Sequence, residues 1–193
     1  MTEHLPVLVI IIPLVLALIA PVAGRLNRIY SWAVALLATV FSFVGSVLLL
    51  HQVMYSGTIS YWMGGWEPPW GIEYVIDYFS GFVLVIVSFL AVAVTIFARK
   101  SVADEIDKKK IPAFYGVYLL FIVGLMGMIV TGDIFNLYVF LEISSLTGYA
   151  LVAMGKRRKA PLAGFRYLVI GTVGATFILL GIGYLYIATG TLN

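Results

Sequence analysis

The chain has 193 residues, of which 62% are hydrophobic and only 11% are charged, and its formal net charge is +3. Charged residues make up about a quarter of a soluble domain, so this composition, with a mean hydropathy of +1.07, indicates an integral membrane protein. The absence of cysteine excludes disulfides and thiolate metal sites. The two histidines lie at segment ends, which excludes a haem-binding helix bundle.

The first apolar segment runs from Leu5 to Ala23 and ends in small residues, as a signal peptide does. A signal peptide also needs a positively charged start, whereas residues 1–4 supply only Glu3 and His4 as ionisable side chains. We therefore expect a retained first membrane helix.

Six segments are long and apolar enough to cross a bilayer, which needs about 20 helical residues. Their apolar runs are continuous, without polar/apolar alternation, which argues against a membrane β-barrel. The sequence thus predicts an all-α, polytopic protein with a single membrane domain over residues 1–193, and with transmembrane helices near 5–23, 30–54, 78–98, 113–130, 134–154 and 165–188.

The loops between these helices differ completely in charge. All 12 basic residues lie in or beside the first, third and fifth loops, at positions 25, 28, 99, 100, 108–110, 156–159 and 166. The second loop, the fourth loop and the C-terminal tail contain no basic residue. By the positive-inside rule, the loops between helices one and two, three and four, and five and six face the cytoplasm, and both termini lie outside the plasma membrane.

Aromatic residues mark the long second loop, residues 55–77. Trp62, Trp66 and Trp70 fit an interfacial aromatic belt, with a binding role as the alternative, and the Gly- and Pro-rich sequence predicts turns and extended chain. The basic runs on the other side are interpreted as solvated connectors and topology signals, with attraction to anionic lipid as a secondary role. Neither run indicates nucleic-acid binding, because each is short and adjoins a membrane helix.

Glu142 is the one ionisable side chain deep inside a predicted span. It lies nine residues after Asp133, or about 13 Å along the helix axis, which places it near the bilayer midplane. A charge there costs about 2.5–3.5 kcal/mol, so the carboxyl group must face protein or water, or stay protonated. We expect Glu142 to take up and release protons or to pair with a mobile cation. The alternative is a neutral acid that only hydrogen-bonds between helices.

Three hydroxyl side chains share the predicted helix face of Glu142. Tyr138, Ser145 and Tyr149 lie four residues before it, three after it and seven after it. They would support an ion pathway, and ordinary packing is an equally open interpretation. Arg166, at the inner end of the sixth helix, is a candidate charge partner or a residue that snorkels to the interface. Because arginine keeps its proton, it would act only as a fixed charge.

Two aspartates stand at predicted helix starts. Asp133 follows Thr131-Gly132 and opens the fifth helix, with Asn136 three residues on, and Asp77 opens the third helix with Ser80 three residues on. Helix capping is therefore favoured over ion binding at both positions, because an acidic N-cap also suits the positive helix end.

The stretch GDIFNLYVFLEISSLTGYAL, residues 132–151, resembles the fifth-helix signature of the antiporter-like subunits. This family includes the large Mrp sodium/proton antiporter subunits, the proton-pumping membrane subunits of respiratory complex I, and homologues in membrane-bound hydrogenases and sulfane reductases. The amino-acid sequence of this stretch is most similar to the Mrp D-type branch. The Asp77-Tyr78-Phe79-Ser80 start of helix three and the segment 165–193 also resemble the family, so the resemblance covers essentially the whole chain.

The resemblance implies a role for Glu142. In this family the fifth-helix glutamate pairs with a lysine on a broken seventh helix, and changes in that pairing accompany proton or sodium movement. The family fold has two inverted five-helix repeats behind three leading helices. This sequence holds six helices and has no lysine in any span, so we expect another polypeptide to supply the seventh-helix lysine, or else a structural role.

Two functions follow as expectations. The first is an ion-translocating membrane subunit of a multi-subunit complex, an Mrp-type antiporter or an energy-converting redox complex, with Glu142 as a protonatable relay. The alternative is a non-conducting scaffold in the same kind of complex. We expect no cofactor, metal or catalytic chemistry in this chain, with any redox centres in other subunits. The expected partners are membrane subunits, redox subunits and lipid.

Overall fold

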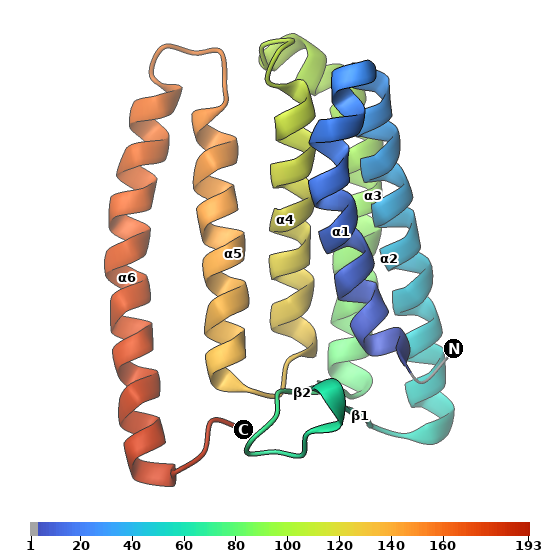
Figure 1. The fold of residues 1–193 in the computed structure, drawn as a ribbon, viewed down its shortest axis with the longest axis vertical. Coiled ribbons are helices and arrows are strands. Elements are labelled where there is room, and N and C mark those ends of the chain that lie inside the picture. The colour runs from blue at the N-terminus through green and yellow to red at the C-terminus, as the bar shows by residue number, and fades with distance from the viewer. Residues whose placement is uncertain (1–3) are drawn as a thin grey trace.

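The computed structural model describes residues 4–193 and is dominated by six long helices (Figure 1). They are α1 (Leu5–Leu26), α2 (Arg28–Ser56), α3 (Tyr78–Glu105), α4 (Ile111–Val130), α5 (Ile134–Ala153) and α6 (Ala160–Thr189). All six are long and apolar enough to cross a membrane, which confirms the predicted all-α polytopic class. Residues 1–3, which supported the argument against a signal peptide, lie outside the described residues.

Two helices extend well beyond the predicted spans. The prediction ended the third helix at Ala98 and began the sixth at Phe165, whereas α3 continues to Glu105 and α6 begins at Ala160. A hydropathy pattern detects only the apolar part of a helix that fits the bilayer. Charged helical turns beyond the bilayer are therefore missed. Proline in the first turn of α6 is compatible with this earlier start, because the N–H that it lacks would have had no helical partner.

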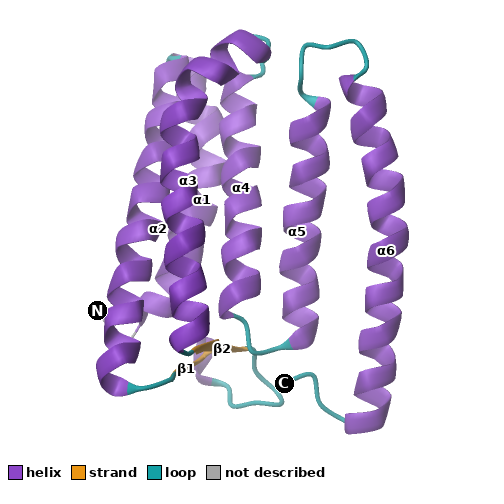
Figure 2. Ribbon diagram, turned by 180° about the vertical axis from the view of Figure 1, so that it is seen from behind, coloured by secondary structure: helices purple, strands orange, loops and turns teal. Residues whose placement is uncertain are grey.

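The helices form a bundle with an extension to one side. Helices α1 to α4 pack against one another, whereas α5 packs on α4 and α6 packs on α5, so that α4, α5 and α6 stand in a row (Figures 1 and 2). Both clusters of buried apolar side chains lie mainly within α1 to α4. The buried share of the most apolar stretch falls from 56% in α4 to 22% in α5 and 11% in α6. The outer two helices therefore depend on fewer neighbours.

A small hairpin closes one end of the bundle. Strands β1 (Ile59–Trp62) and β2 (Glu73–Ile76) pair antiparallel, and a 3-10 turn, η2 (Met63–Gly65), follows β1. Tyr74 of β2 also pairs with Thr131 just before α5, where the Gly132 N–H donates to the Glu73 carbonyl at 2.9 Å. The hairpin thus holds the start of α5.

A matching contact ties the opposite end. Ile106, after α3, forms an antiparallel bridge with Gly155, after α5, and the Lys156 N–H donates to the Glu105 carbonyl at 3.1 Å. Both ends of α5 are therefore joined by backbone hydrogen bonds to segments that border α3.

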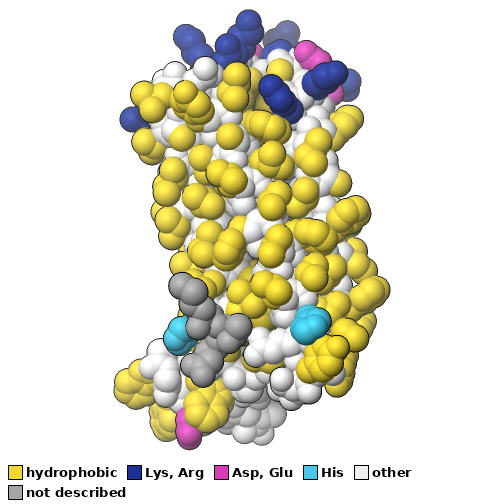
Figure 3. Space-filling model, turned by 90° about the vertical axis from the view of Figure 1, so that its right-hand side faces the viewer, with side chains coloured by type: hydrophobic (Ala, Val, Ile, Leu, Met, Phe, Trp, Pro, Cys, Tyr) yellow, Lys and Arg dark blue, Asp and Glu magenta, His cyan; other side chains and the backbone are white. Residues whose placement is uncertain are grey.

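Basic side chains gather at one end of the bundle. Figure 3 shows lysine and arginine side chains gathered at the end opposite the hairpin, over a broad apolar band. The described chain starts and finishes at the hairpin end (Figure 1). We call the other end the basic end, because it holds the loops that carry residues 99–110 and 156–159. That the basic end faces the cytoplasm and both termini face outside remains a prediction.

Candidate functional site

Glu142 lies midway along α5, as its depth in the sequence predicts. Its side chain is half-buried, and its Oε1 atom is fully buried without a hydrogen-bond partner in residues 4–193. Buried polar atoms in proteins are almost always hydrogen-bonded, since an unmet acceptor costs about 1–3 kcal/mol. Ser42 Oγ is the other buried side-chain atom without a partner in the described residues, and Glu142 is the ionisable one of the two.

The side of α5 opposite Glu142 packs tightly on α4. Phe140 and Ser144 are buried there, against glycines of the facing helix. A Cβ added at Gly124 would lie 2.7 Å from the Ser144 backbone nitrogen, and one at Gly127 would collide with the Phe140 ring. These glycines let the two backbones approach closely, which leaves no room for a polar path between α4 and α5 at this level.

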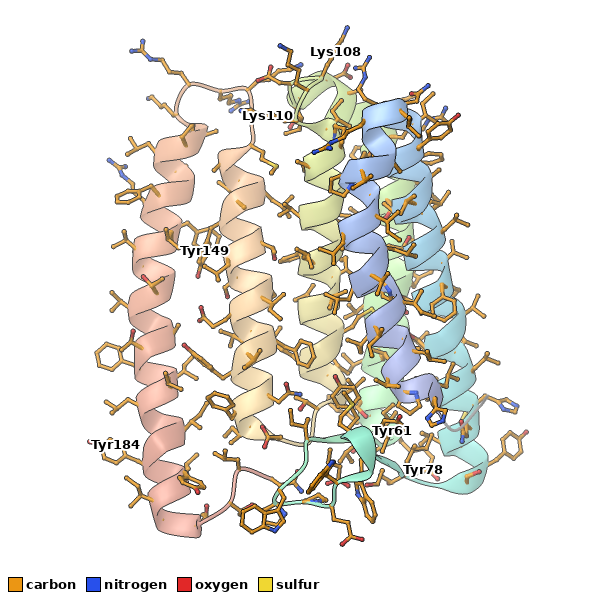
Figure 4. The ribbon with its side chains drawn as sticks, in the orientation of Figure 1. Tyr61, Tyr78, Lys108, Lys110, Tyr149 and Tyr184 are labelled. Atoms are coloured by element: carbon orange, nitrogen blue, oxygen red, sulfur yellow. The ribbon has the colours of Figure 1, made fainter. Side chains whose placement is uncertain are left out.

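Tyr149 identifies the helix that Glu142 faces. Its ring is buried, meets the Tyr167 ring edge to face at 4.6 Å between centroids, and points from α5 toward α6 (Figure 4). Its hydroxyl lies where a Cβ on Gly171 of α6 would be. With 3.6 residues per turn, a residue seven positions away lies about 20° from Tyr149 around the axis. Glu142 is that residue, so its carboxyl group lies on the α6 side.

The predicted polar group shares this side of α5 but is not directly connected. Tyr138 and Ser145 are half-buried and fall within about 60° of Glu142 around the helix. Among residues 4–193, no hydrogen bond joins Glu142 to either of them or to Tyr149. The structure thus places the four residues along one face, with the hydroxyl groups spaced along the axis rather than gathered around the carboxylate.

Arg166 does not reach Glu142. It is exposed in the second turn of α6, and the single ion pair of the described residues is Lys110–Asp107, at 3.8 Å. Since Gly171 is level with Tyr149, the part of α6 level with Glu142 lies about seven residues further on, roughly 18 Å from Arg166 along the axis. Arg166 therefore lies near the basic end of α6.

Asp133 and Asn136 form the cap of α5. The Asn136 N–H donates to Asp133 Oδ1 at 2.6 Å, and the Asn136 side-chain amide donates to Thr131 Oγ1 at 3.0 Å. Asn136 is buried below Tyr74, and burial raises the pKa of that tyrosine, with a smaller opposing effect from hydrogen bonding to Asn136. This geometry is a helix cap joined to the hairpin.

Asp77 caps α3 in the same way. Its Oδ1 accepts the Ser80 N–H at 2.7 Å, while Ser80 Oγ accepts the Asp77 N–H at 2.8 Å, which completes a reciprocal capping box. The hydrogen bonds from Ser80 hold the pKa of Asp77 below its usual value. Both aspartates therefore have structural partners, unlike Glu142.

Several features of the site lie beyond the sequence analysis. Gly164 packs against Ala153 at the basic end of the α5–α6 contact, and the pairing of Tyr149 with Gly171 was not predicted. A small-residue spacing of seven, from 164 to 171 in α6, is the signal that could have indicated this contact.

Comparisons with known proteins find similar sequences. Residues 131–193 match the family model described as "NADH:quinone oxidoreductase/Mrp antiporter, TM". The chain is 44% identical over 194 residues to "NADH-quinone oxidoreductase subunit N" of Desulforudis audaxviator, covering 100% of this chain and 38% of that protein.

Two solved structures share the fold. A chain of the archaeal membrane-bound sulfane sulfur reductase superposes with a TM-score of 0.90 at 34% identity, over 98% of this chain and 38% of that one. A chain of the Mrp complex from a Dietzia species superposes with a TM-score of 0.83 at 26% identity, over 100% of this chain and 35% of that one. The chain thus spans less than half the length of each relative.

Proposed function

The matches support an antiporter-like subunit family for this chain, and on that premise we propose that it is a membrane subunit of an Mrp-type antiporter or a complex I-like complex. In this proposal the complex moves protons or sodium ions, and the chain belongs to the plasma membrane with its basic end in the cytoplasm. Any redox chemistry belongs to other subunits, and no cofactor is assigned to this chain.

Glu142 acts as a protonatable relay in this function. The observation that carries the proposal is its buried Oε1 atom, which has no hydrogen-bond partner in residues 4–193 and lies midway along α5 on the side of α6. Burial favours the neutral carboxyl group and a nearby cation favours the carboxylate, so a cation that approaches and withdraws drives proton uptake and release.

The cation comes from outside the residues described. Arg166 is too far along α6, and Lys100, the one lysine inside a helix of the described residues, lies at the basic end of α3. We assign the basic group to a helix outside the described residues that packs beside α5 and α6. Tyr138, Ser145 and Tyr149 then serve as hydroxyl groups along the path, above and below the carboxylate on the same face of α5.

The test is Glu142→Gln in the assembled complex, with ion translocation measured by a pH-sensitive dye in membrane vesicles. The amide keeps the shape of the side chain but cannot exchange a proton. Translocation is therefore expected to fall by about 100-fold or more, since a positioned proton-transfer group contributes about 10²–10⁴-fold to a rate. Glu67→Gln is the matched control, because Glu67 is exposed in the hairpin loop. Its translocation should equal that of the wild type.

A scaffold function is the second candidate. Two observations favour a scaffold. Phe140 and Ser144 pack closely on the glycines of α4, and no hydrogen bond in the described residues joins Glu142 to the hydroxyl groups of its face. A Glu142→Gln complex that assembles normally and translocates at the wild-type rate would establish the scaffold and reject the relay.

A further inference from the structure

A second polar site lies at the basic end, far from Glu142. A cavity of about 340 Å³ opens between the ends of α2, α3 and α4. We call it the arginine pocket, after Arg28 and Arg99 in its wall; Asn27, Trp32, Val102 and Tyr115 also line it. Its volume is that of a small-molecule site, and no acidic side chain of the described residues contributes to its lining.

The two arginines are available for an anion. Both side chains are exposed, and neither forms an ion pair in residues 4–193, where the single pair is Lys110–Asp107. A guanidinium group donates two parallel N–H bonds to phosphate oxygens, which makes arginine the preferred residue for phosphate recognition. The pocket also borders the starts of α2 and α4, whose positive ends favour an anion, and the end of α3, whose negative end opposes it.

Trp32 holds Arg99 in position. The indole Nε1–H donates to the Thr95 carbonyl of α3 at 2.9 Å, which fixes the ring between α2 and α3. The Arg99 guanidinium carbon lies 4.7 Å above the centre of that ring. Stacking on the ring restricts the guanidinium while its edge remains free to donate, so the group is oriented before any ligand binds.

The rest of the pocket is apolar. Tyr115 is 2% exposed and Val102 is 6% exposed at its inner wall, while Ile29, at the rim, is 53% exposed toward the surroundings of the bundle. A ligand that fits has a negative head for the arginines and an apolar body that continues along the helices. A free phosphate ion has only the first of these parts.

We propose that the arginine pocket binds the phosphate headgroup of an anionic phospholipid from the membrane leaflet at the basic end. Basic pockets between membrane helices on the cytoplasmic side are suited to such headgroups. The headgroup phosphate bridges Arg28 of α2 and Arg99 of α3, and the acyl chains lie against the apolar surface beside Ile29. The lipid thereby links two helices of the bundle.

Native mass spectrometry of the purified complex, titrated with phosphatidylglycerol, tests this proposal. The double variant Arg28→Gln/Arg99→Gln should bind phosphatidylglycerol at least about tenfold more weakly than the wild type, because two charge-assisted contacts are lost. The matched control is Arg158→Gln/Lys159→Gln, which removes two charges at the same end but none from the pocket. Its loss of affinity should be clearly smaller than that of the pocket variant, because neither side chain lines the pocket.

Two further measurements keep the outcome decisive. If the double variant does not fold, Arg99→Lys replaces it, since lysine keeps the charge but loses the flat group that stacks on Trp32, and binding should still weaken. Inorganic phosphate is added as a competitor. Equal losses in the two double variants, wild-type binding by Arg99→Lys, or displacement of the lipid by millimolar phosphate would each overturn the assignment of an anionic lipid.

Discussion

At the scale of single residues, the depth of Glu142 was predictable and its direction was not. Hydropathy alone places position 142 in the middle of a span, because the apolar run on either side has to fill the bilayer. The helical period also predicts that Tyr138, Ser145 and Tyr149 share its face. Which neighbour covers that face depends on packing, and the contact of Tyr149 with Gly171 decides it.

The arginine pocket could not have been predicted at this scale. Arg28 and Trp32 lie about seventy residues before Arg99 in the sequence, and the two arginines are explained there as part of the basic loops. Only the side-by-side packing of α2 and α3 brings the three groups together.

The carboxylate of Glu73 supports a prediction about pH. Hydrogen bonds from Ser60, and then from Asn193 at 3.0 Å, hold the pKa of Glu73 below its usual value of 4.5. A lowered folded-state pKa gives stability that is present above the ordinary value and is lost as the pH falls through the folded value. The wild type should therefore be more stable than Glu73→Gln at about pH 7, and this advantage should shrink below about pH 4.5.

Thermal unfolding midpoints in detergent, measured across that pH range, check this expectation. Glu67→Gln is the control, because the Glu67 side chain is exposed and its hydrogen bonds in the described residues are made by the backbone carbonyl, which the substitution keeps. A constant difference between the wild type and Glu73→Gln at every pH would contradict the predicted linkage.

At the scale of elements, the glycines of α4 determine how closely α5 approaches. The sequence indicates that Gly124 and Gly127 share a face, but small residues are common in membrane helices and do not identify their partner. In the structure both glycines meet α5, at Ser144 and Phe140. The second-loop strands were also not specified, since the sequence predicts turns and extended chain without a pairing partner.

Gly124→Ala is expected to destabilise the protein by about 1–3 kcal/mol, the usual cost of overpacking. The added Cβ would lie 2.7 Å from the Ser144 nitrogen and 2.9 Å from the Phe140 carbonyl oxygen, and backbone atoms cannot rotate away. Gly174→Ala in α6 is the matched control, because its Cβ meets nothing within 4 Å. Alanine is the better helix former, so this variant should show no loss of stability.

Unfolding of both variants in the same detergent gives the comparison. Equal unfolding midpoints for Gly124→Ala and Gly174→Ala would mean that α4 and α5 can move apart without loss of stability. The close approach of the two helices would then not stabilise the protein.

At the scale of the whole molecule, the charge asymmetry of the loops predicts the orientation of the protein in the membrane. Six spans require that both ends of the chain lie on one side, and the structure has them together at the hairpin end. The sequence predicts the number of spans, because each apolar run is separated by a polar or turn-rich segment. It does not predict that α5 and α6 extend to one side of the α1–α4 bundle, since hydropathy carries no information on which helices are neighbours.

Labelling of introduced cysteines checks the orientation, and the chain offers a background free of native cysteine. Thr58→Cys, exposed before β1, should react with a membrane-impermeant maleimide in intact cells. Arg158→Cys, exposed at the basic end, should react only after the membrane is opened. The reverse pattern would invert the assigned topology.

The backbone bridges at the two ends of α5 have a mechanical consequence. Thr131 is joined to β2 at one end, and Gly155 is joined to the segment after α3 at the other. A helix held at both ends cannot tilt or slide by much unless one of these backbone contacts breaks. The segment after α6 adds a further backbone contact at the hairpin end of α5, since the Ile134 N–H donates to the Leu192 carbonyl at 2.8 Å. The flank of α5 that carries the buried acid is therefore expected to keep its position relative to the hairpin.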